Sequence, residues 1–372
     1  MRRGGIPLNR KRVCIYCQKW ESGGIESFLY NVLSRTDLSA LEVDLVVEQL
    51  GESVFTQRLR EKGICFVELS GSVRRAKENE RAFRRLLAVG NYSAVWLNVY
   101  QGMALRYLRM AKTAGVGVRI AHSHNTDLRQ SHTREIKLWL HRRYSKIYAK
   151  DATALWACSE AAAKFMFLPT LLQERGYTFI PNGIETERFR FDPAVRETVR
   201  QELGLNDRFV IGNVGRLCYQ KNQSFLLDVL VEARKLRPES CLLLVGDGED
   251  RQMLEEKAQA LGIADYVMFC GTTNQVEKLF WAMDVFAFPS RFEGLGIVAV
   301  EAQAAGLPVV CSQYVPQEAS VTARLRKLPP TAATTWAEEL CGSVGTEREL
   351  GAQEVFCAGF DVNAVAKAVK WS

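Results

Sequence analysis

The chain lacks any apolar run of 18 residues, so we expect no membrane-spanning helix. Residues 1–12 are basic but contain no apolar stretch of the kind that a secretory signal needs. The ten cysteines stand singly, without the spacing of metal ligands, and Cys14 and Cys17 are the only near pair. We therefore predict core thiols in a reducing cytoplasm, with neither disulfides nor a metal site.

Positive charge is concentrated in the first half of the chain. Residues 1–182 hold 29 Lys and Arg against 16 Asp and Glu, whereas residues 183–372 hold 20 against 26. The densest basic stretches are residues 74–85 and 132–150. No nucleic-acid-binding motif accompanies this charge, so we expect no nucleic-acid partner.

Apolar and basic residues are interleaved at helical spacing in the second basic stretch. The apolar ones are Trp139, Leu140, Tyr144 and Ile147, and the cations are Arg134, Lys137, Arg142, Arg143 and Lys146. Such a surface fits peripheral contact with an anionic membrane. A helix with one core face and one solvated basic face explains the same pattern, and both interpretations stay open.

Short apolar segments alternate with amphipathic ones along the chain, which predicts parallel sheets covered by helices. The predicted strands of the first half are residues 12–16, 42–47, 65–69, 94–98, 118–121, 154–158 and 177–180. Those of the second half are residues 209–214, 240–245, 266–270, 285–288 and 307–311. The breaker triplet Pro181-Asn182-Gly183 separates the two halves. We predict domains over residues 1–182 and 183–358, with the ligand site between them.

The most informative segment follows the strand predicted at residues 285–288. There Gly294-Leu295-Gly296 opens a helix, with Glu293 before the glycines and Glu301 inside the helix. Free amides at a helix N-terminus suit a phosphate group. The two oxygens of Glu301 match both hydroxyls of a ribose, and Glu293 could accept hydroxyls of a second sugar attached to the phosphate.

Two other interpretations of this segment stay open. Glu293 and Glu301 could be solvated surface charges. Residues 294–299 also match the G-x-G-x-x-A dinucleotide fingerprint, but the strand predicted at residues 307–311 ends in Ser-Gln in place of a ribose-binding acid.

Six further motifs accompany this segment in a specific order. They are Gly-Gly-Ile-Glu-Ser (23–27), Ala-His-Ser-His-Asn (121–125), Ala-Cys-Ser-Glu (157–160), Ile-Pro-Asn-Gly-Ile (180–184), Gly-Arg-Leu-Cys-Tyr-Gln-Lys-Asn (215–222) and Leu-Val-Gly-Asp-Gly-Glu (244–249). With them the chain resembles glycosyltransferase family 4, the retaining GT-B enzymes, in its capsular and exopolysaccharide branch. The resemblance implies two Rossmann-like, doubly wound α/β domains facing each other across a cleft. It also implies that the first domain binds the acceptor, the second binds the nucleotide sugar, and a helix in residues 359–372 crosses back to the first.

The resemblance assigns the donor site to the second domain. Its predicted residues are Gly215, Arg216, Lys221, Glu293, Gly294, Leu295, Gly296 and Glu301. Arg216 and Lys221 would stabilise the charge that grows on the leaving diphosphate, the alternative being an exposed basic loop. The sequence contains no Asp-x-Asp pair of the kind used by metal-dependent glycosyltransferases, so we expect neither a metal nor a cofactor besides the donor.

On the acceptor side we expect Gly23, Gly24 and His122 to line a phosphate or acceptor loop. His122 and His124 end a predicted strand, where we expect them to point to opposite faces, one of them towards the cleft. The resemblance places a histidine near the reacting sugar, and we favour His124. A purely structural turn and structural histidines stay open as alternatives.

The predicted catalytic set is therefore His124, Arg216, Lys221 and Glu293, with no protein nucleophile. We predict a metal-independent retaining transferase that moves a hexose from a nucleotide-diphosphate sugar, of which the resemblance favours a uridine one, to a glycan or lipid-linked glycan of surface polysaccharide synthesis. We expect it in the cytoplasm, at the inner face of the membrane. A nucleotide-sugar epimerase and a non-catalytic nucleotide- or glycan-binding protein of the same fold stay open.

Overall fold

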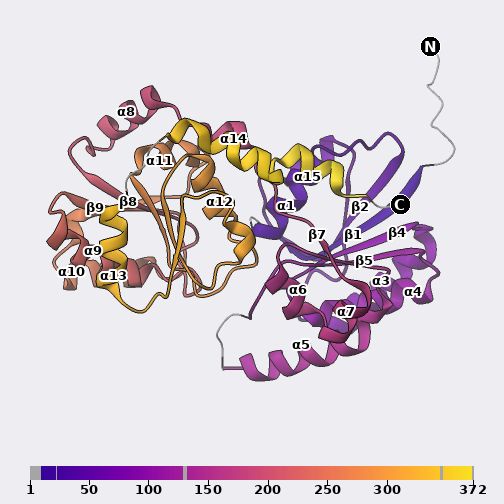
Figure 1. The fold of residues 1–372 in the computed structure, drawn as a ribbon. Helices are drawn as coiled ribbons and strands as arrows, with labels where there is room; N and C mark the ends of the chain where they lie inside the picture. The colour runs from indigo at the N-terminus through magenta and orange to yellow at the C-terminus, as the bar shows by residue number, and fades with distance from the viewer. Residues whose placement is uncertain (1–9, 22, 129–131, 344–346, 371–372) are drawn as a thin grey trace, which may run out of the picture. The chain divides into compact units, whose positions relative to one another are not determined.

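The computed structural model describes residues 10–21, 23–128, 132–343 and 347–370. The chain forms two compact units, one of residues 1–183 with 362–372 and the other of residues 184–361 (Figure 1). The sequence-based boundaries, after residues 182 and 358, lie beside these divisions, and the functions assigned to the two domains stay predictions. Within the described ranges no helix has the length and apolar character needed to cross a membrane.

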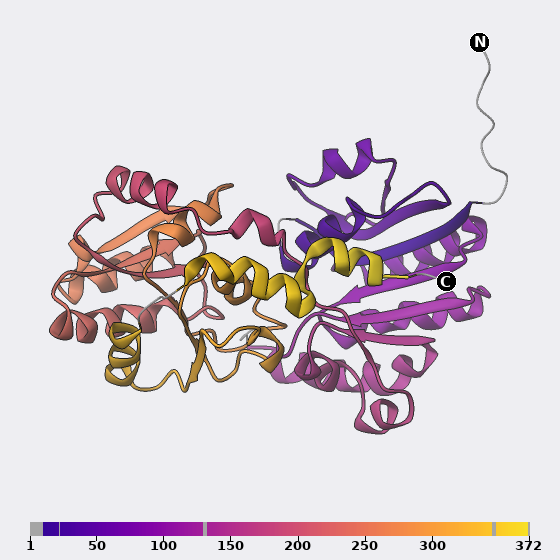
Figure 2. The same cartoon turned by 45° about the horizontal axis from the view of Figure 1, so that its top comes forward.

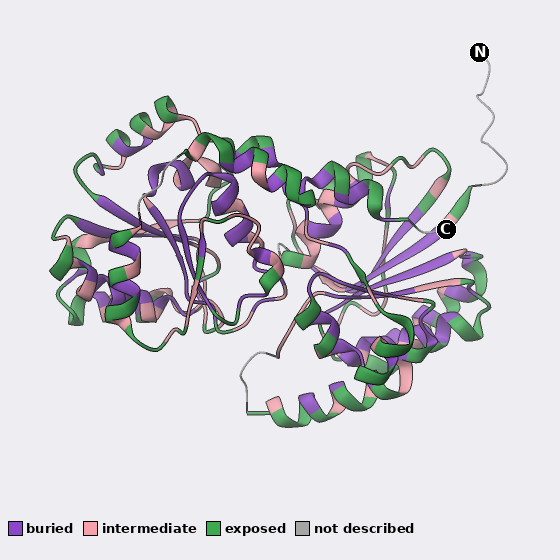
Figure 3. Ribbon diagram, in the orientation of Figure 1, coloured by how far each residue is buried: buried purple, intermediate pink, exposed green. Residues whose placement is uncertain are grey.

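Unit 1 is built on a parallel sheet with the strand order β3-β2-β1-β4-β5-β6-β7. Its strands are β1 Lys11–Trp20, β2 Leu41–Leu50, β3 Cys65–Glu68, β4 Ala94–Val99, β5 Val118–Ser123, β6 Ala154–Ala157 and β7 Thr178–Phe179. Its helices are α1 Gly24–Leu33, α2 Thr56–Glu61, α3 Ala76–Gly90, η1 Gly102–Leu105, α4 Arg106–Thr113, α5 Arg134–Tyr148, η2 Ala149–Asp151, α6 Glu160–Met166, α7 Pro169–Arg175 and α15 Val362–Ala368. Every residue of β4 is buried, as expected for an inner strand covered on both faces (Figure 3).

Unit 2 repeats this plan with the strand order β10-β9-β8-β11-β12-β13. Its strands are β8 Phe209–Val214, β9 Ser240–Val245, β10 Val267–Gly271, β11 Val285–Phe288, β12 Val309–Ser312 and β13 Leu325–Leu328. Its helices are η3 Thr186–Phe189, α8 Pro193–Glu202, α9 Gln223–Leu236, α10 Arg251–Ala260, η4 Ala264–Tyr266, α11 Val276–Ala282, α12 Ile297–Ala304, η5 Gln317–Ala319, α13 Ala333–Gly342, η6 Arg348–Leu350, α14 Gly351–Val355 and η7 Phe356–Phe360. The predicted α/β class with two Rossmann-like domains is therefore confirmed (Figure 2).

The chain passes between the units twice, and the two passages are neighbours. In unit 2 the Ile184 amide donates to the Phe360 carbonyl at 2.8 Å, and Ile184 forms a β-bridge with Asp361. In unit 1 helix α15 packs on α1, and Val365 joins the hydrophobic core. A Cβ on Gly183 would lie 2.7 Å from Val362 Cα, so glycine permits this approach.

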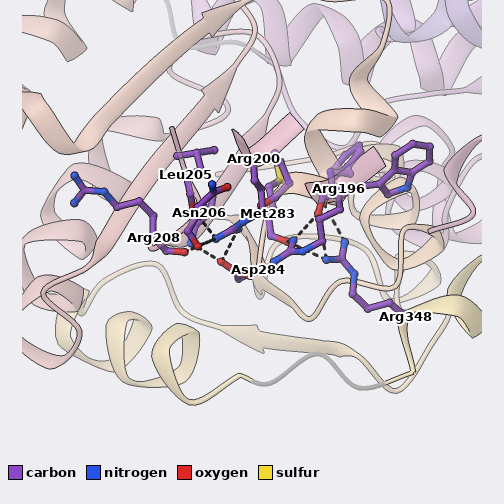
Figure 4. Close-up of polar contacts among 12 residues, drawn as sticks. Arg196, Arg200, Leu205, Asn206, Arg208, Met283, Asp284 and Arg348 are labelled. Atoms are coloured by element: carbon purple, nitrogen blue, oxygen red, sulfur yellow. Dashed lines mark hydrogen bonds and ion pairs between the residues drawn. The ribbon is translucent and has the colours of Figure 1, made fainter. Parts of the chain in front are cut away.

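Three arginines, Arg196, Arg200 and Arg348, donate to carbonyls at the C-terminal end of α11, and Arg348 also reaches that of α12. Figure 4 shows them near Met283 and Asp284. The guanidinium of Arg348 donates to the carbonyls of Phe280, Trp281, Met283 and Ala305 at 3.1 to 3.4 Å. Arg196 and Arg200 donate to carbonyls of the same segment and pair with Asp284 at 2.5 and 3.2 Å. Carbonyls at a helix C-terminus have no partner inside the helix, so these cations replace the missing donors.

Arg348 itself is held in an environment that disfavours its charge. Burial, with the neighbouring charge of Arg196, lowers the pKa of Arg348 to about 9. The guanidinium still carries its proton at neutral pH, and the carbonyl oxygens around it compensate for lost solvation.

We expect Arg348→Met to lower the free energy of unfolding by about 2–4 kcal/mol, because several buried carbonyls lose their donor at once. Urea unfolding of the full chain, followed by circular dichroism, measures this change. Arg326→Met is the matched control, since Arg326 lies exposed on β13. Equal stability of the two variants would show that water satisfies those carbonyls.

Candidate functional site

The loops that follow β8 and β9 in unit 2 pack against each other so closely that glycine is needed. A Cβ on Gly246 would lie 2.2 Å from the Gly215 carbonyl oxygen, and one on Gly248 would lie 2.2 Å from that of Leu217. Gly246 and Gly215 also have φ values of 127° and 151°, which other residues rarely adopt. These two loops are therefore tightly packed against each other at the carboxyl ends of β8 and β9.

Two buried amide side chains hold the loop after β8 from beneath. Asn213 donates to the Ala287 carbonyl at 2.8 Å and accepts from Gln223 at 3.3 Å. Gln223 also donates to the Arg216 carbonyl at 3.0 Å, and its side-chain oxygen accepts from the Cys218 amide. Neither residue was predicted from the sequence, because no sequence motif identifies a buried amide whose hydrogen-bond partners are unknown.

Further hydrogen bonds join this loop to the one that follows β11. Asn222 donates to the Pro289 carbonyl at 3.3 Å and accepts from Arg291 at 2.7 Å. Gln220 donates to the Phe292 carbonyl at 3.0 Å and accepts from the Arg291 amide at 2.8 Å. Asn222 has a φ of 58°, a left-handed conformation that asparagine tolerates better than most residues. The structure thus brings the predicted cationic loop beside the predicted acidic one.

Lys221 and Glu293, both predicted site residues, form an ion pair at 2.7 Å. Their side chains are only 18% and 8% exposed, and the Lys221 ammonium also lies 4.8 Å from the centre of the Phe288 ring. Arg216 pairs with Glu249 at 3.0 Å, but at 66% exposure its guanidinium stays accessible. Both predicted phosphate-binding cations are therefore paired with carboxylates. An anionic ligand would have to displace these carboxylates or share the cations with them.

The glycine turn follows Glu293 in the chain, and a Cβ on Gly296 would lie 3.7 Å from the Cγ of Glu293. Gly296 has a φ of 85° and precedes α12, and a Cβ there would lie 3.1 Å from Val315 and 3.2 Å from Phe288. Leu295 is buried between the two glycines. The hydroxyl of Ser290 in the same loop is buried and has no hydrogen-bond partner within the described ranges. Ser290 is a second polar residue that sequence reasoning missed.

Glu301 lies half-buried inside α12. No recorded hydrogen bond or ion pair involves its carboxylate within the described part of the chain. Burial raises the pKa of Glu301 to about 7, and the charges of Arg188 and Lys221 oppose this effect. Arg188 is itself paired with Glu277 at 2.7 Å and donates to the Asn274 carbonyl at 2.6 Å. An unpartnered carboxylate beside two cations is suited to accept hydroxyl groups of a ligand.

The residues predicted for the acceptor loop lie in unit 1. Helix α1 begins at Gly24, with Gly23 as its N-cap, and the Gly23 carbonyl accepts from the Ser27 amide at 3.0 Å. A Cβ on Gly24 would meet no atom within 4 Å, so its backbone lies open. This accessibility fits a loop that a ligand approaches, and the role of the loop stays a prediction.

His122 and His124 point to the same face, so the prediction that they point to opposite faces is wrong. Their ring centroids are 4.0 Å apart, and both rings contact Phe28 of α1 at 5.2 and 5.0 Å. The reason is the strand repeat, which returns to one face every second residue. His124 shares a hydrogen bond with Asn98 at 2.9 Å.

Both histidines are neutral in this environment. Burial lowers the pKa of His122 well below its ordinary value, with His124 adding to the effect, and burial lowers the pKa of His124 to about 3. Both ring nitrogens of His122, Nδ1 of His124 and Nδ2 of Asn98 are buried without a partner in the described structure. At pH 7 neither ring carries a positive charge, and His122 is fully buried.

A metal centre would need several acidic, thiol or imidazole ligands together. Over the residues that the structure describes, no three His, Cys, Asp or Glu side chains are grouped in this way. The expectation that the chain needs no metal stays a prediction.

The chain is similar in sequence to known proteins. Residues 195–325 match the family model of glycosyl transferases group 1, so unit 2 carries a group 1 glycosyltransferase domain. EpsF of Bacillus subtilis, which is named as a glycosyltransferase, is 28% identical over 91% of this chain and 89% of its own length. A Mycobacterium tuberculosis protein named GDP-mannose-dependent alpha-(1-6)-phosphatidylinositol monomannoside mannosyltransferase is 29% identical over 77% of this chain and 76% of its own.

A solved structure shares the fold over nearly the whole chain. Anabaena HepE, solved in complex with UDP, has a TM-score of 0.78 at 20% identity and covers 96% of this chain and 98% of its own. The predicted GT-B fold is thus confirmed, and the glycosyltransferase family model matched by residues 195–325 agrees with the predicted resemblance.

The raised pKa of Glu301 predicts a pH dependence of stability. Its ordinary pKa is 4.5, so between about pH 4.5 and 7 the folded chain keeps a proton that the unfolded chain releases. The free energy of unfolding should therefore fall by about 1–3 kcal/mol as pH rises through this window. Urea unfolding from pH 5 to 8 should show that Glu301→Gln removes this loss. Glu338→Gln, at an exposed position on α13, should retain it. If both variants follow the wild type, Glu301 ionises freely in the folded chain.

Proposed function

We propose that this chain is a retaining, metal-independent glycosyltransferase that moves a hexose from a nucleotide-diphosphate sugar, a UDP-sugar, to a glycan acceptor. The observation that carries the proposal is the junction of the two loops in unit 2. There Lys221, Glu293 and the glycine turn before α12 lie together where hydrogen bonds join the loops after β8 and β11. The group 1 domain over residues 195–325 supports the reaction class.

In this proposal the diphosphate binds to the two cations and to the glycine turn. Lys221 would exchange Glu293 for phosphate oxygens, and the exposed Arg216 would bind the same group. The amides of residues 294–296 and the N-terminus of α12 would add hydrogen-bond donors. Glu301 would accept both ribose hydroxyls, and Ser290 is placed to add a donor. Glu293, once released from Lys221, would accept hydroxyls of the hexose.

The same residues would support cleavage of the bond between the hexose and the diphosphate. The acceptor hydroxyl oxygen forms a bond to the anomeric carbon on the face from which the diphosphate leaves, while the bond from that carbon to the phosphate oxygen breaks. The released phosphate oxygen takes the hydroxyl proton, so no protein nucleophile is needed. Lys221 and Arg216 would stabilise the charge that grows on the diphosphate. His124, as a neutral imidazole, would form a hydrogen bond with the hexose.

For the acceptor we propose a lipid-linked glycan of surface polysaccharide synthesis, bound by unit 1 near Gly23 and Gly24. The name of the mycobacterial relative includes a lipid-linked mannoside, which supports this class. That relative is GDP-mannose-dependent by name, whereas Anabaena HepE was solved with UDP. The identity of the nucleotide base must therefore be determined by comparing several nucleotide-sugar donors.

Transfer should be measured with UDP- and GDP-hexoses in the presence of EDTA, with and without a lipid-diphosphate-sugar acceptor. We expect one donor to release its nucleotide diphosphate only with acceptor, and the anomeric configuration to be retained in the product by NMR. Lys221→Ala should lower turnover about 100-fold. Lys235→Ala, at an exposed position on α9, should match the wild type.

The outcomes of this experiment separate the alternatives. Interconversion of the sugar without release of a nucleotide diphosphate would favour an epimerase, and tight binding without turnover a non-catalytic protein. Turnover that EDTA abolishes would contradict metal independence.

We further propose that unit 1 contacts an anionic membrane through α5. The helix buries Leu138, His141 and Ser145, whereas Ile136 and Trp139 are 63% and 59% exposed. Exposed cations flank this apolar pair, namely Lys137, Arg142, Arg143 and Lys146. Basic residues around exposed apolar side chains fit an anionic lipid surface.

The proposed membrane-contacting surface contains fewer of the residues of the sequence pattern than expected. Leu140, Tyr144 and Ile147 are half-buried, so they add little to the exposed surface. Arg134 is paired with Asp127 at 2.7 Å. Ile136, which the interleaved pattern left out, is one of the two most exposed apolar residues of the helix.

Ile136→Glu with Trp139→Glu should lower binding to vesicles of phosphatidylcholine and phosphatidylglycerol by about tenfold or more, because apolar contact and charge attraction weaken together. Co-sedimentation measures this binding, and Val54→Glu, at an exposed position away from α5, is the control. Equal binding of both variants, or binding to phosphatidylcholine alone at the same level, would overturn the proposal.

A further inference from the structure

We propose that Gln18, Tyr100 and Gln101 form a subsite of unit 1 that recognises the hydroxyl groups of a neutral sugar. The three residues lie at the carboxyl ends of β1 and β4, the edge of a parallel sheet where ligands bind. If the chain is a glycosyltransferase, as proposed above, this sugar is the terminal residue of the acceptor. Binding of the sugar itself can be tested without that assumption.

The subsite is supported by a buried carboxylate. Glu48 of β2 is fully buried and accepts hydrogen bonds from the hydroxyls of Tyr16 at 3.0 Å and Tyr107 at 2.6 Å. Arg106, which is 11% exposed, lies 3.4 Å from Glu48 and 3.0 Å from Glu80. Because its charge is met by several donors, Glu48 is a fixed anchor and not a free ligand group.

This anchor fixes the orientation of the Gln18 amide. The amide nitrogen of Gln18 donates to Glu48 at 3.1 Å. Its oxygen must then face away from the carboxylate, where it accepts from the Tyr100 hydroxyl and from the Gln101 amide at 3.2 Å. The chain Glu48, Gln18, Tyr100 and Gln101 thus runs from the core of unit 1 to its surface.

The outer end of this chain keeps hydrogen-bonding capacity. In the described structure no hydrogen bond uses the side-chain oxygen of Gln101, and the Tyr100 oxygen accepts only a long hydrogen bond from the Gln101 amide, at 3.5 Å. Burial, with the charges of Glu48, Glu26 and Glu21, raises the pKa of Tyr100 to about 12, so the phenol keeps its proton. Neighbouring acceptors and donors in fixed positions match adjacent hydroxyls of a sugar ring.

The segment that carries Tyr100 and Gln101 is itself anchored. The Gly102 amide donates to Nδ1 of His141 at 2.8 Å, and a Cβ on Gly102 would lie 2.4 Å from the His141 carbonyl oxygen. Only glycine fits there, so α5 holds the end of the segment in place. The Tyr100 ring remains 38% exposed and offers an apolar surface to a ligand.

The groups at the outer end of the subsite indicate the class of ligand. Glu48, Glu26 and Glu21 are close enough to affect the ionisation of Tyr100, and Glu26 lies in the first turn of α1, beside Gly23 and Gly24. Because Glu48 is paired with Arg106 and Glu21 with Lys19 at 3.6 Å, the groups offered to a ligand are the neutral amides and the phenol, which match sugar hydroxyls. The site is therefore placed to bind a neutral sugar next to the open loop at the start of α1.

Saturation-transfer NMR with the methyl glycosides of glucose, galactose, mannose and N-acetylglucosamine tests the subsite directly. We expect at least one glycoside to bind the wild type, and Tyr100→Phe and Gln101→Ala each to raise its Kd about five- to tenfold. Gln57→Ala, at an exposed position on α2, should leave the Kd unchanged. The midpoint of thermal unfolding and the affinity for UDP should stay at wild-type values in all three variants.

Two results would overturn the subsite: no glycoside binding to the wild type, or the same glycoside Kd in Tyr100→Phe and Gln101→Ala as in the wild type. A parallel transfer assay separates this inference from the proposed function. There the two variants should raise the KM for the acceptor while leaving the KM for the donor and kcat unchanged. Glycoside binding that depends on Tyr100 and Gln101, in a chain that transfers no sugar, would retain the subsite and remove the proposed function.

Discussion

The ion pair between Lys221 and Glu293 is the contact on which the candidate site of unit 2 depends. It joins the loops after β8 and β11, and neutral hydrogen bonds from Gln220 and Asn222 hold the same two loops in register. A pair with little exposure is costly to break by removing one partner, since the other charge is left buried. In the proposed function a ligand phosphate would replace the carboxylate as the partner of Lys221, and hydroxyls of the hexose would become the partners of Glu293. In the absence of a ligand, the pair joins the two loops.

Much of the fold could be predicted because buried parallel strands are continuous apolar runs. The predicted residues 209–214, 240–245 and 285–288 coincide with β8, β9 and β11. Strand β13 was missed, because Leu-Arg-Lys-Leu at a sheet edge carries charge between its apolar residues. In the site, charged residues near glycines could be found from sequence. Asn213, Gln223 and Ser290 could not, since their importance lies in burial and partners that only the folded chain reveals.

Buried and half-buried polar groups fall into two contrasting classes in this structure. Glu48 and Arg348 are surrounded by partners that meet their charge, and each ties secondary-structure elements together. Glu301 and His122 have no recorded hydrogen bond within the described ranges, although burial shifts the pKa of both. A fully satisfied group contributes to stability, whereas an unsatisfied one costs free energy that a ligand can recover.

The pairing of Ile184 with Asp361 means that unit 2 begins and ends at one point. Unit 1 is therefore interrupted in the chain, and its last helix, α15, is made only after all of unit 2. During synthesis on the ribosome, unit 2 can complete its fold while the core of unit 1 still lacks Val365. Chains that terminate early would leave the apolar surface of α1 uncovered, a feature that chaperones and proteases recognise.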